Sequence, residues 1–439
     1  MNVIELLSRL VEFNTVNNPG KGIKPSEDCA KFIRDTLSSF GVDANIMEVN
    51  GFYTVHGVIG DGEPVIGLMA HYDTVPFIEE EWNYNPLKLT IVNGKGYGRG
   101  AVDDKANVAS IMIALKEITK LIKRGTIVYA FTGDEEIGGA NGAAVWAKML
   151  ERRNLMPKYL INGDGINMNI IIRRRNVFRV TIKVKTYTKV VRGIKKVKKF
   201  TLQTPISNTG HAAYFIPGVD HHPLIAASQF LRHDLRLYAL DLKGSFIKSN
   251  VLPKYVELTY IEPSENGEEF VVDEGLRELL RAIIPISRMI FRTERYSDLG
   301  ITITPNIYEK HGNSHVVVFD IRAMISDTKD LEESLKYVLN YTLPQAEFKV
   351  SYGGGYLYTD PSSKLVQTSL KVLEALGESP RTIEAAGASD SRFFSSKDIE
   401  IIDIGPKGGN VHGPNEYVEL DSLKKMPLFY TKVIEKILE

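Results

Sequence analysis

Cysteine is almost absent from this chain of 439 residues: Cys29 is the only one. A single cysteine excludes an intrachain disulfide, which together with the lack of any signal-peptide pattern predicts a cytoplasmic protein. The first residues, Met1-Asn2-Val3-Ile4-Glu5, lack the basic and apolar segments of such a signal. No apolar run approaches the roughly 18 residues that a membrane-spanning helix needs. We therefore expect no membrane association.

A surplus of charge of either sign is also missing, because Lys+Arg and Asp+Glu both number 54. The overall balance gives no reason to expect a polyanionic partner such as nucleic acid. With 43% hydrophobic and 25% charged residues, the composition is that of a globular protein. The length exceeds that of one ordinary hydrophobic core, so two domains are expected.

One segment departs from this balance: residues 173–199 hold twelve Lys or Arg and no Asp or Glu. Unopposed cations can mark an anion-binding or nucleic-acid-binding module, or a surface that pairs with an acidic subunit. However, the charges alternate with Val, Ile and Phe, as on the solvated face of a strand pair. Aromatic residues for base stacking are few (Phe178, Tyr187, Phe200), so nucleic-acid binding is the less favoured interpretation.

The first third of the chain alternates strand and helix signals. Short apolar strands are predicted at Val65–Ala70, Ile127–Phe131 and Tyr159–Ile161, with a helical pattern over Asn107–Lys123. This βαβ rhythm predicts an α/β domain with an open, mostly parallel sheet.

The pattern changes near residue 173 and returns after Gly353-Gly354-Gly355, which has the composition of a hinge. Between these points the predicted order is β-α-β-β-β-α-β, with helices at Pro223–Leu242 and Leu331–Leu343. We therefore predict a discontinuous catalytic domain, residues 1–172 and 354–439. An α+β, ferredoxin-like domain, residues 173–353, is inserted into it.

Metal-ligand side chains follow three of the predicted strands at the point where each ends. His71 and Asp73 follow the first, Glu135 and Glu136 the second, and Asp164 the third. Fully apolar strands are typical of buried parallel sheets, and ligands bind at the carboxyl edge of such sheets. These side chains are therefore expected to meet at one edge.

Two further clusters belong to the same set. Asp103 and Asp104 precede the predicted helix Asn107–Lys123, and His412 follows a predicted strand, Ile399–Ile404. Each motif alone can have a purely structural role, because Asp-Asp and Glu-Glu pairs are common at solvated helix starts and Asp-Gly is a turn signal. Their coincidence at strand ends favours a zinc-type metal site built from imidazoles and carboxylates.

Four segments resemble the di-zinc amidohydrolase family, which contains carboxypeptidase G, acetylornithine deacetylase, succinyl-diaminopimelate desuccinylase and dipeptidases. They are His71–Pro76, Gly98–Lys105, Gly133–Gly139 and His412–Val418, and they occur in the order that the family uses. The resemblance also fits an inserted domain, which in the family serves as a lid and dimerisation domain. A homodimer is expected on this basis.

The resemblance implies two Zn²⁺ ions, for which Co²⁺ or Mn²⁺ can substitute. Asp103 would bridge them, His71 and Asp164 would complete one site, and Glu136 and His412 the other. Glu135 would be the general base that acts on water between the metals, and Asp73 would orient His71.

In the inserted domain, the segment Ser207–Ala213 resembles a family motif whose histidine stabilises the oxyanion, often from the partner subunit. His211 is the candidate, with its protonated imidazole as the donor. Arg322, in an Asp-x-Arg element, and Asn250, in an Asn-Val-Leu-Pro element, resemble groups that bind the substrate carboxylate. About 65 residues separate these two elements, unlike in the family, so Asn306 is an alternative to Asn250. Ser389 lies in a loop that resembles one near the substrate.

The expected activity is metal-dependent hydrolysis of an amide bond next to a free carboxylate, as in an exopeptidase or dipeptidase. Asp at position 164, where the biosynthetic deacylases of the family mostly have Glu, favours the peptidase. The alternative within the same chemistry is an N-acyl-amino-acid deacylase, such as a desuccinylase or deacetylase. In either case the expected partner is a small peptide or N-acyl-amino-acid substrate.

Overall fold

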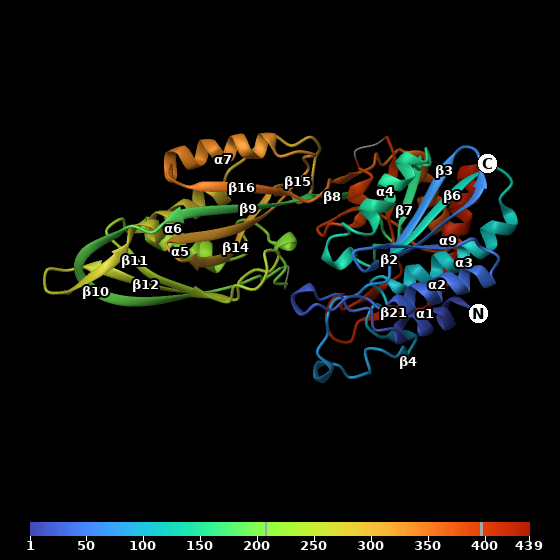
Figure 1. Ribbon diagram of the computed structural model, residues 1–439, viewed down its shortest axis with the longest axis horizontal. Coiled ribbons are helices and arrows are strands. Elements are labelled where there is room, and N and C mark those ends of the chain that lie inside the picture. The colour runs from blue at the N-terminus through green and yellow to red at the C-terminus, as the bar shows by residue number, and fades with distance from the viewer. Residues whose placement is uncertain (207–208, 396–397) are drawn as a thin grey trace. The chain divides into compact units, whose positions relative to one another are not determined.

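The computed structural model describes residues 1–206, 209–395 and 398–439 (Figure 1). The chain divides into two compact units: unit 1 is Met1–Arg174, Leu357–Ala385 and Ser389–Glu439, and unit 2 is Arg175–Tyr356 with Ala386–Ala388. The chain passes from one unit to the other after Arg174 and after Tyr356, slightly beyond the expected boundaries at 172 and 353. At the first boundary the reason is strand β8 (Ile170–Arg174), which continues to Arg174 within the sheet of unit 1. Ser207 and Asn208, part of the predicted oxyanion segment, lie outside the described residues.

Unit 1 is built around a mixed sheet in the order β1-β2-β6-β3-β7-β19-β8-β17, with β18 paired to β8. The strands other than β8 are β1 (Asn45–Val49), β2 (Phe52–Asp61), β3 (Val65–His71), β6 (Gly125–Thr132), β7 (Tyr159–Asn162), β17 (Leu357–Tyr358), β18 (Thr382–Ala385) and β19 (Glu400–Asp403). The central strands β6, β3, β7 and β19 are parallel, which confirms the predicted fold class.

Helices cover both faces of this sheet (Figure 1). The larger core contains residues of α1 (Val3–Glu12), α2 (Glu27–Ser39), α3 (Lys105–Leu121), α8 (Lys364–Ala375) and α9 (Leu420–Leu438). The smaller core contains α4 (Ala143–Arg152). Strand β3 contributes Ile66 and Leu68 to the first core and Val65 and Met69 to the second, which is why its sequence is apolar throughout.

A small antiparallel sheet holds two loops of unit 1 together. It consists of β4 (Thr90–Val92), β5 (Lys95–Tyr97), β20 (Gly408–Gly409) and β21 (Tyr417–Glu419), in the order β20-β21-β5-β4. The loop that follows β5 carries Asp103, and the loop between β20 and β21 carries His412. This pairing brings together two segments that are roughly 300 residues apart in the chain, and its strands are too short to be seen as a sequence pattern.

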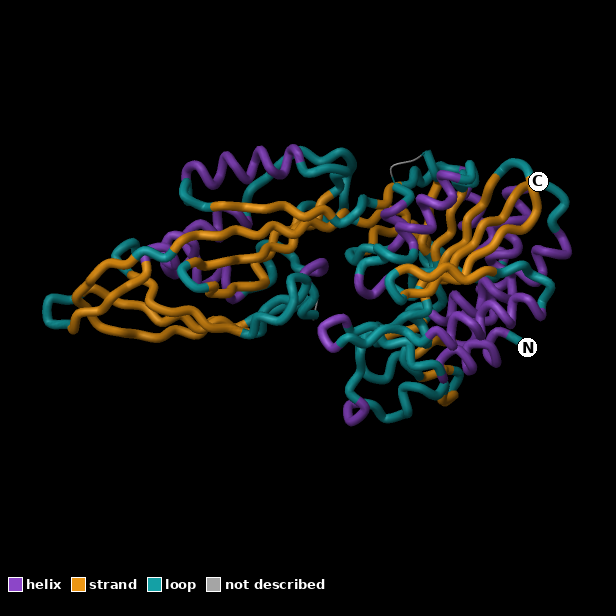
Figure 2. Tube along the Cα trace, viewed as in Figure 1, coloured by secondary structure: helices purple, strands orange, loops and turns teal. Residues whose placement is uncertain are grey.

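Unit 2 contains two four-stranded sheets (Figure 2), in the orders β14-β15-β9-β16 and β11-β12-β10-β13. Their strands are β9 (Asn176–Lys185), β10 (Thr188–Thr201), β11 (Tyr238–Gly244), β12 (Tyr255–Pro263), β13 (Glu268–Asp273), β14 (Thr302–His311), β15 (Ser314–Ala323) and β16 (Glu347–Tyr352). The helices are α5 (Pro223–His233), α6 (Glu274–Ser287) and α7 (Lys329–Thr342). No helix in the described ranges has both the length and the apolar character to cross a membrane.

The two sheets of unit 2 share one topology. In each, the strands lie side by side in the order second, third, first, fourth when numbered along the chain. The first sheet, with α6 and α7 in its connections, has a ferredoxin-like arrangement, but its first helix is α6 and not the predicted helix at Pro223–Leu242, which corresponds to α5 of the second sheet. The second sheet is nested in the connection from β9 to α6, and α5 lies in its connection from β10 to β11. Strands β12 and β13 of this nested sheet lie between Asn250 and Arg322 in the sequence. They account for part of the wide separation of these two residues along the chain.

The predicted helix Pro223–Leu242 is wrong in its second half. Helix α5 ends at His233, and Tyr238–Gly244 forms strand β11 instead. The reason is a local turn, because the carboxylate of Asp234 accepts a hydrogen bond from the backbone N–H of Arg236 at 3.0 Å. A side chain that bonds the following backbone in this way competes with helix continuation.

The basic segment runs through strands β8 to β10, and its negative partners lie on neighbouring strands. Arg192 lies opposite Glu269 of β13, with 3.4 Å between the charged atoms, and Lys199 lies opposite Glu257 of β12. Lys196 forms an ion pair with Glu262. These cross-strand pairs neutralise part of the charge that an anionic ligand would require. The nucleic-acid alternative therefore gains no support.

Candidate metal centre

The predicted ligands gather at the carboxyl edge of the unit 1 sheet. Because β3 pairs in parallel with β6 and β7, the ends of these strands coincide, and His71 lies opposite Thr132 in register. Glu136 and Asp164 follow within four residues of those strand ends. His71, Glu135 and Asp164 have ligand atoms within 4.8 Å of one another, and so do His71, Asp103 and Glu136.

Asp103 lies between the two histidines. Its Oδ1 is 3.1 Å from Nε2 of His71, and its Oδ2 is 3.0 Å from Nε2 of His412. Glu136 Oε1 is in turn 3.1 Å from the same nitrogen of His412. One carboxylate with an oxygen toward each imidazole is the arrangement that a ligand shared by two cations requires.

The donor set fits metal ions. Carboxylates outnumber imidazoles around Asp103, so repulsion between the acidic groups favours cations among them. Imidazole nitrogens with carboxylate oxygens are the ligands of catalytic zinc, and cobalt or manganese accept the same donors. His71, Asp103 and Asp164 could hold one ion, and Asp103, Glu136 and His412 the other.

Asp73 is fully buried and orders this edge of the sheet. Its Oδ1 accepts from the backbone N–H of Glu135 and its Oδ2 from that of Glu136, both at 3.1 Å. Nδ1 of His71 lies 3.1 Å from the backbone oxygen of Asp73 and 3.4 Å from its Oδ1. A proton on Nδ1 satisfies these oxygens and leaves the lone pair of Nε2 for a metal.

A second ordering residue, Glu416, was not singled out from the sequence. Its buried carboxylate accepts from the backbone N–H groups of Val102 and Asp103 at 3.0 and 3.1 Å, and from Arg99 Nη1 at 2.6 Å. Arg99 also donates to the backbone oxygen of His412 at 3.3 Å. The pair therefore fixes both loops that meet at Asp103. The only sequence signal was the position of Glu416 inside the motif that begins at His412.

The surroundings of Glu135 and of His412 shift the pKa of each side chain. Burial raises the pKa of Glu135 well above its ordinary value, the nearby His71 opposes this shift, and the carboxylates of Asp390 and Glu136 add to it. For His412, whose side chain is 48% exposed, partial desolvation acts to lower the pKa, but the charges and hydrogen bonds of Glu136 and Asp103 outweigh it and raise the pKa to about 12. Glu135 is thus a carboxyl group with increased proton affinity beside the ligand cluster, as a general base requires.

His211 and Asn250 are neighbours in unit 2. Nδ1 of His211 accepts from the backbone N–H of Ala213 at 3.1 Å, so in this arrangement the ring is neutral and its proton is on Nε2. The side-chain amide of Asn250 lies 3.3 Å from that Nε2. Because Oδ1 of Asn250 is buried without a hydrogen-bond partner, rotating the amide by half a turn lets this oxygen accept from Nε2–H.

Arg322 and Asn306 are both buried in unit 2. Arg322 makes two hydrogen bonds to Asp320, at 2.7 and 3.0 Å, so this aspartate holds the guanidinium in place. Nδ2 of Asn306 donates to Ser249 O and Thr304 Oγ1, and its Oδ1 accepts from Nε2 of His222 at 3.0 Å. Its bonds are internal, so Asn250, beside His211, is the better candidate for contact with substrate.

Ser389 lies in unit 1 and is 1% exposed. Its hydroxyl donates to Asp403 Oδ2 at 2.7 Å rather than facing an open surface. Direct substrate binding, the role expected from sequence, is not what this geometry provides.

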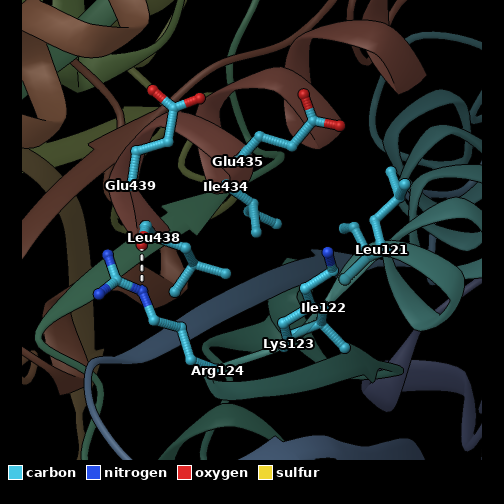
Figure 3. Close-up of a pocket in the computed structure, with 9 residues that line it drawn as sticks. Leu121, Ile122, Lys123, Arg124, Ile434, Glu435, Leu438 and Glu439 are labelled. Atoms are coloured by element: carbon cyan, nitrogen blue, oxygen red, sulfur yellow. Dashed lines mark hydrogen bonds between the residues drawn. The ribbon is translucent and has the colours of Figure 1, made fainter.

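A cavity of about 600 Å³ lies elsewhere in unit 1, between the C-terminal ends of α3 and α9 (Figure 3). Ile122, Arg124 and Leu438 are among its lining residues, and Arg124 donates to the backbone oxygen of Leu438. None of the predicted site residues lines it.

An α/β unit with imidazoles and carboxylates clustered at its sheet edge has the donor set of a metal-dependent hydrolase. Comparison with known proteins identifies the family. The chain belongs to peptidase family M20/M25/M40, whose model matches residues 67–436. It is therefore a metal-dependent hydrolase of amide bonds, and the predicted family is confirmed.

Relatives match along the whole chain. Succinyl-diaminopimelate desuccinylase of Nautilia profundicola is 25% identical over 443 residues, covering 99% of this chain and all of the relative. The enzyme of the same name from Nitratiruptor is 25% identical over 447 residues, covering 99% of each chain. The aminoacylhistidine dipeptidase of Vibrio alginolyticus has a similar fold, with a TM-score of 0.72, 16% identity, and coverage of 99% of this chain and 96% of that one.

Proposed function

We propose that the protein hydrolyses the amide bond next to a free carboxylate in a short peptide, as an exopeptidase or dipeptidase. Amide hydrolysis is supported by Asp103, with one oxygen toward each of two histidines, beside the raised pKa of Glu135, and the choice of a peptide substrate rests on Asp at position 164. We further propose two Zn²⁺ ions as the metals, with Co²⁺ or Mn²⁺ able to substitute, and a cytoplasmic location.

The residues of this chain divide the reaction between them. Bound metal ions supply Lewis acidity to the scissile carbonyl and lower the pKa of water. Glu135 takes a proton from the attacking water and delivers it to the leaving amine. Asp73 keeps the Nδ1 proton of His71 in place and fixes the backbone of Glu135. Arg322, held by Asp320, and Asn250 are the proposed contacts for the substrate carboxylate.

A second candidate is deacylation of an N-acyl-amino acid. Two relatives that each match 99% of this chain are succinyl-diaminopimelate desuccinylases, which favours this alternative. Both reactions use the same attack on an amide and differ only in what lies on the acyl side. The metal cluster therefore does not discriminate between them.

A substrate panel with added zinc, cobalt or manganese separates the candidates. We expect dipeptides and tripeptides with a free C-terminal carboxylate to be cleaved, and the corresponding C-terminal amides to be cleaved much more slowly. The readout is release of free amino acid, with metal-depleted protein as control. Turnover of succinyl- or acetyl-amino acids alone would replace the peptidase with the deacylase, and no turnover of either class would contradict both.

His211 is proposed to stabilise the oxyanion through its Nε2 proton. We expect His211→Ala to lower kcat about 10²–10³-fold, the usual cost of removing one oxyanion donor, and to change KM far less. His221→Ala is the control, because the side chain of this histidine is exposed and its backbone pairs with Gln203. A change confined to KM would make His211 a substrate-positioning residue instead.

We also propose a homodimer. On α7, Tyr337 and Tyr341 are 66% and 77% exposed and their rings lie 5.0 Å apart, which places two adjacent aromatic side chains on the surface of this helix. Aromatic side chains are enriched at the centres of subunit interfaces.

A further inference from the structure

Arg174 contacts one of the proposed metal ligands directly. It ends strand β8 and is 6% exposed. Its Nη2 donates to the backbone oxygen of Asp164 and lies 3.2 Å from Oδ1 of the same residue. One planar guanidinium thus contacts both the main chain and the side chain of Asp164, which restricts the position and the rotation of this carboxylate.

The same guanidinium is held from its other side. Nε of Arg174 donates to Oδ2 of Asp403 at 2.5 Å, and Asp403 is fully buried. Ser389 and Ser391 each donate a hydroxyl hydrogen bond to Asp403. The aspartate therefore has partners on both oxygens, so its charge is compensated without access to water.

The sheet fixes this cluster beside the metal centre. Asp403 ends strand β19 and lies opposite Asn162 of β7, two residues before Asp164. Asn162 also donates to the hydroxyl of Ser391 at 3.1 Å. Strand β7, which leads into Asp164, is thus connected to Asp403 in two ways. One is the parallel pairing of β7 with β19, and the other is the pair of side-chain hydrogen bonds that runs from Asn162 through Ser391 to Asp403. Arg174 and Asp403 are buried, and Arg174 contacts Asp164, whose side chain is 20% exposed, within unit 1.

We propose that Arg174 is a positioning residue that fixes Asp164 as a ligand through a single oxygen. With Oδ1 directed to Arg174, Oδ2 is the oxygen presented to the ion that Asp164 would share with His71. Asp403, Ser389 and Ser391 keep Arg174 in this position, which gives Ser389 a supporting role instead of substrate contact. The inference rests on the proposed dinuclear site.

The consequence is selective for one of the two ions. Outer partners of metal ligands typically contribute 10–100-fold to metal affinity. Arg174 contacts Asp164, whereas the other ion would be held by Glu136, His412 and the shared Asp103. A residue that merely stabilised the fold would weaken both sites or neither. The ratio of the two affinities therefore separates positioning from general stabilisation.

The test is zinc binding to the full-length Arg174→Met variant by isothermal titration calorimetry, after metal removal. We expect the wild type to bind two ions and the variant to keep one at wild-type affinity, with the second weakened about 10–100-fold. Arg173→Met is the matched control, because the guanidinium of this neighbouring residue approaches Glu384, at 3.8 Å, and both affinities should be retained.

Two wild-type affinities in Arg174→Met would overturn the inference, and so would equal weakening of both sites. If the wild type itself bound fewer than two ions, the proposed dinuclear site would fail first, which keeps the two failures distinct. Should Arg174→Met not fold, Arg174→Lys takes its place. Lysine keeps the charge but cannot bond Asp164 and Asp403 with one planar group, so the second affinity should still fall severalfold, and no fall would refute the proposal.

Discussion

Replacing Glu135 by glutamine is expected to remove nearly all turnover while the bound metal stays in place. Glu135 lies within 4.8 Å of ligand atoms of His71 and Asp164, yet its proposed task is proton transfer, which an amide cannot perform. General acid–base groups contribute about 10²–10⁴-fold to rate, so kcat should fall by this factor. KM should change little because glutamine preserves the shape of the side chain. The measurements are steady-state kinetics and metal content by elemental analysis.

The neighbouring residue provides the control. Glu136 lies 3.1 Å from His412 and is a proposed ligand, so Glu136→Gln should lose one metal ion as well as activity. Both variants are thus expected to lose turnover, but only Glu136→Gln is expected to lose a metal ion. Full activity in Glu135→Gln would exclude Glu135 as the base, and loss of metal from it would make it a ligand instead.

The gathering of the candidate metal ligands could be predicted from sequence because a general rule applies. His71, Glu136 and Asp164 each follow a short apolar strand, and parallel neighbours place their carboxyl ends at one edge. The prediction needed neither the exact strand order nor the path of the chain between strands. Local pattern and one packing rule were sufficient.

The supporting contacts could not be predicted in this way. Arg174 with Asp403, and Arg99 with Glu416, join residues that are roughly 230 and 320 positions apart in the chain. Nothing in the local sequence distinguishes such a buried charge from a solvated one, because only the folded packing brings its partner close. Ser389 shows the same limit, since its motif indicated proximity to the site but not the direction of its hydroxyl.

The topology of unit 2 could be predicted from sequence only in part, for a related reason. Strand β10 was included in the basic segment, and its alternation gave no sign that it starts a new sheet. Two consecutive sheets of the same strand order have the same hydrophobic periodicity as one larger sheet. Pairing partners distinguish them: β9 pairs with β15 and β16, whereas β10 pairs with β12 and β13.

Asp103→Asn is expected to have the largest effect on metal content, because both ions would lose the same ligand. The carboxylate oxygens lie 3.1 and 3.0 Å from the two histidines, and the amide offers only one oxygen with no charge. Bound metal should fall from two ions to fewer than one per chain at equal zinc concentration. Turnover should fall at least about 10³-fold, since catalytic metals contribute several kcal/mol.

Asp104→Asn is the matched control for Asp103→Asn, because it removes the carboxylate of the neighbouring residue by the same substitution. Asp104 is buried, but its oxygens accept from the backbone N–H of His71 at 3.2 Å and from Asn107 at 2.7 Å, and neither bond involves an imidazole nitrogen. This variant should keep two metal ions even if the protein becomes less stable, as thermal unfolding would record. Two ions retained in Asp103→Asn would mean that another side chain is shared between the metals. Equal metal loss from both variants would attribute the effect to the loop as a whole rather than to Asp103.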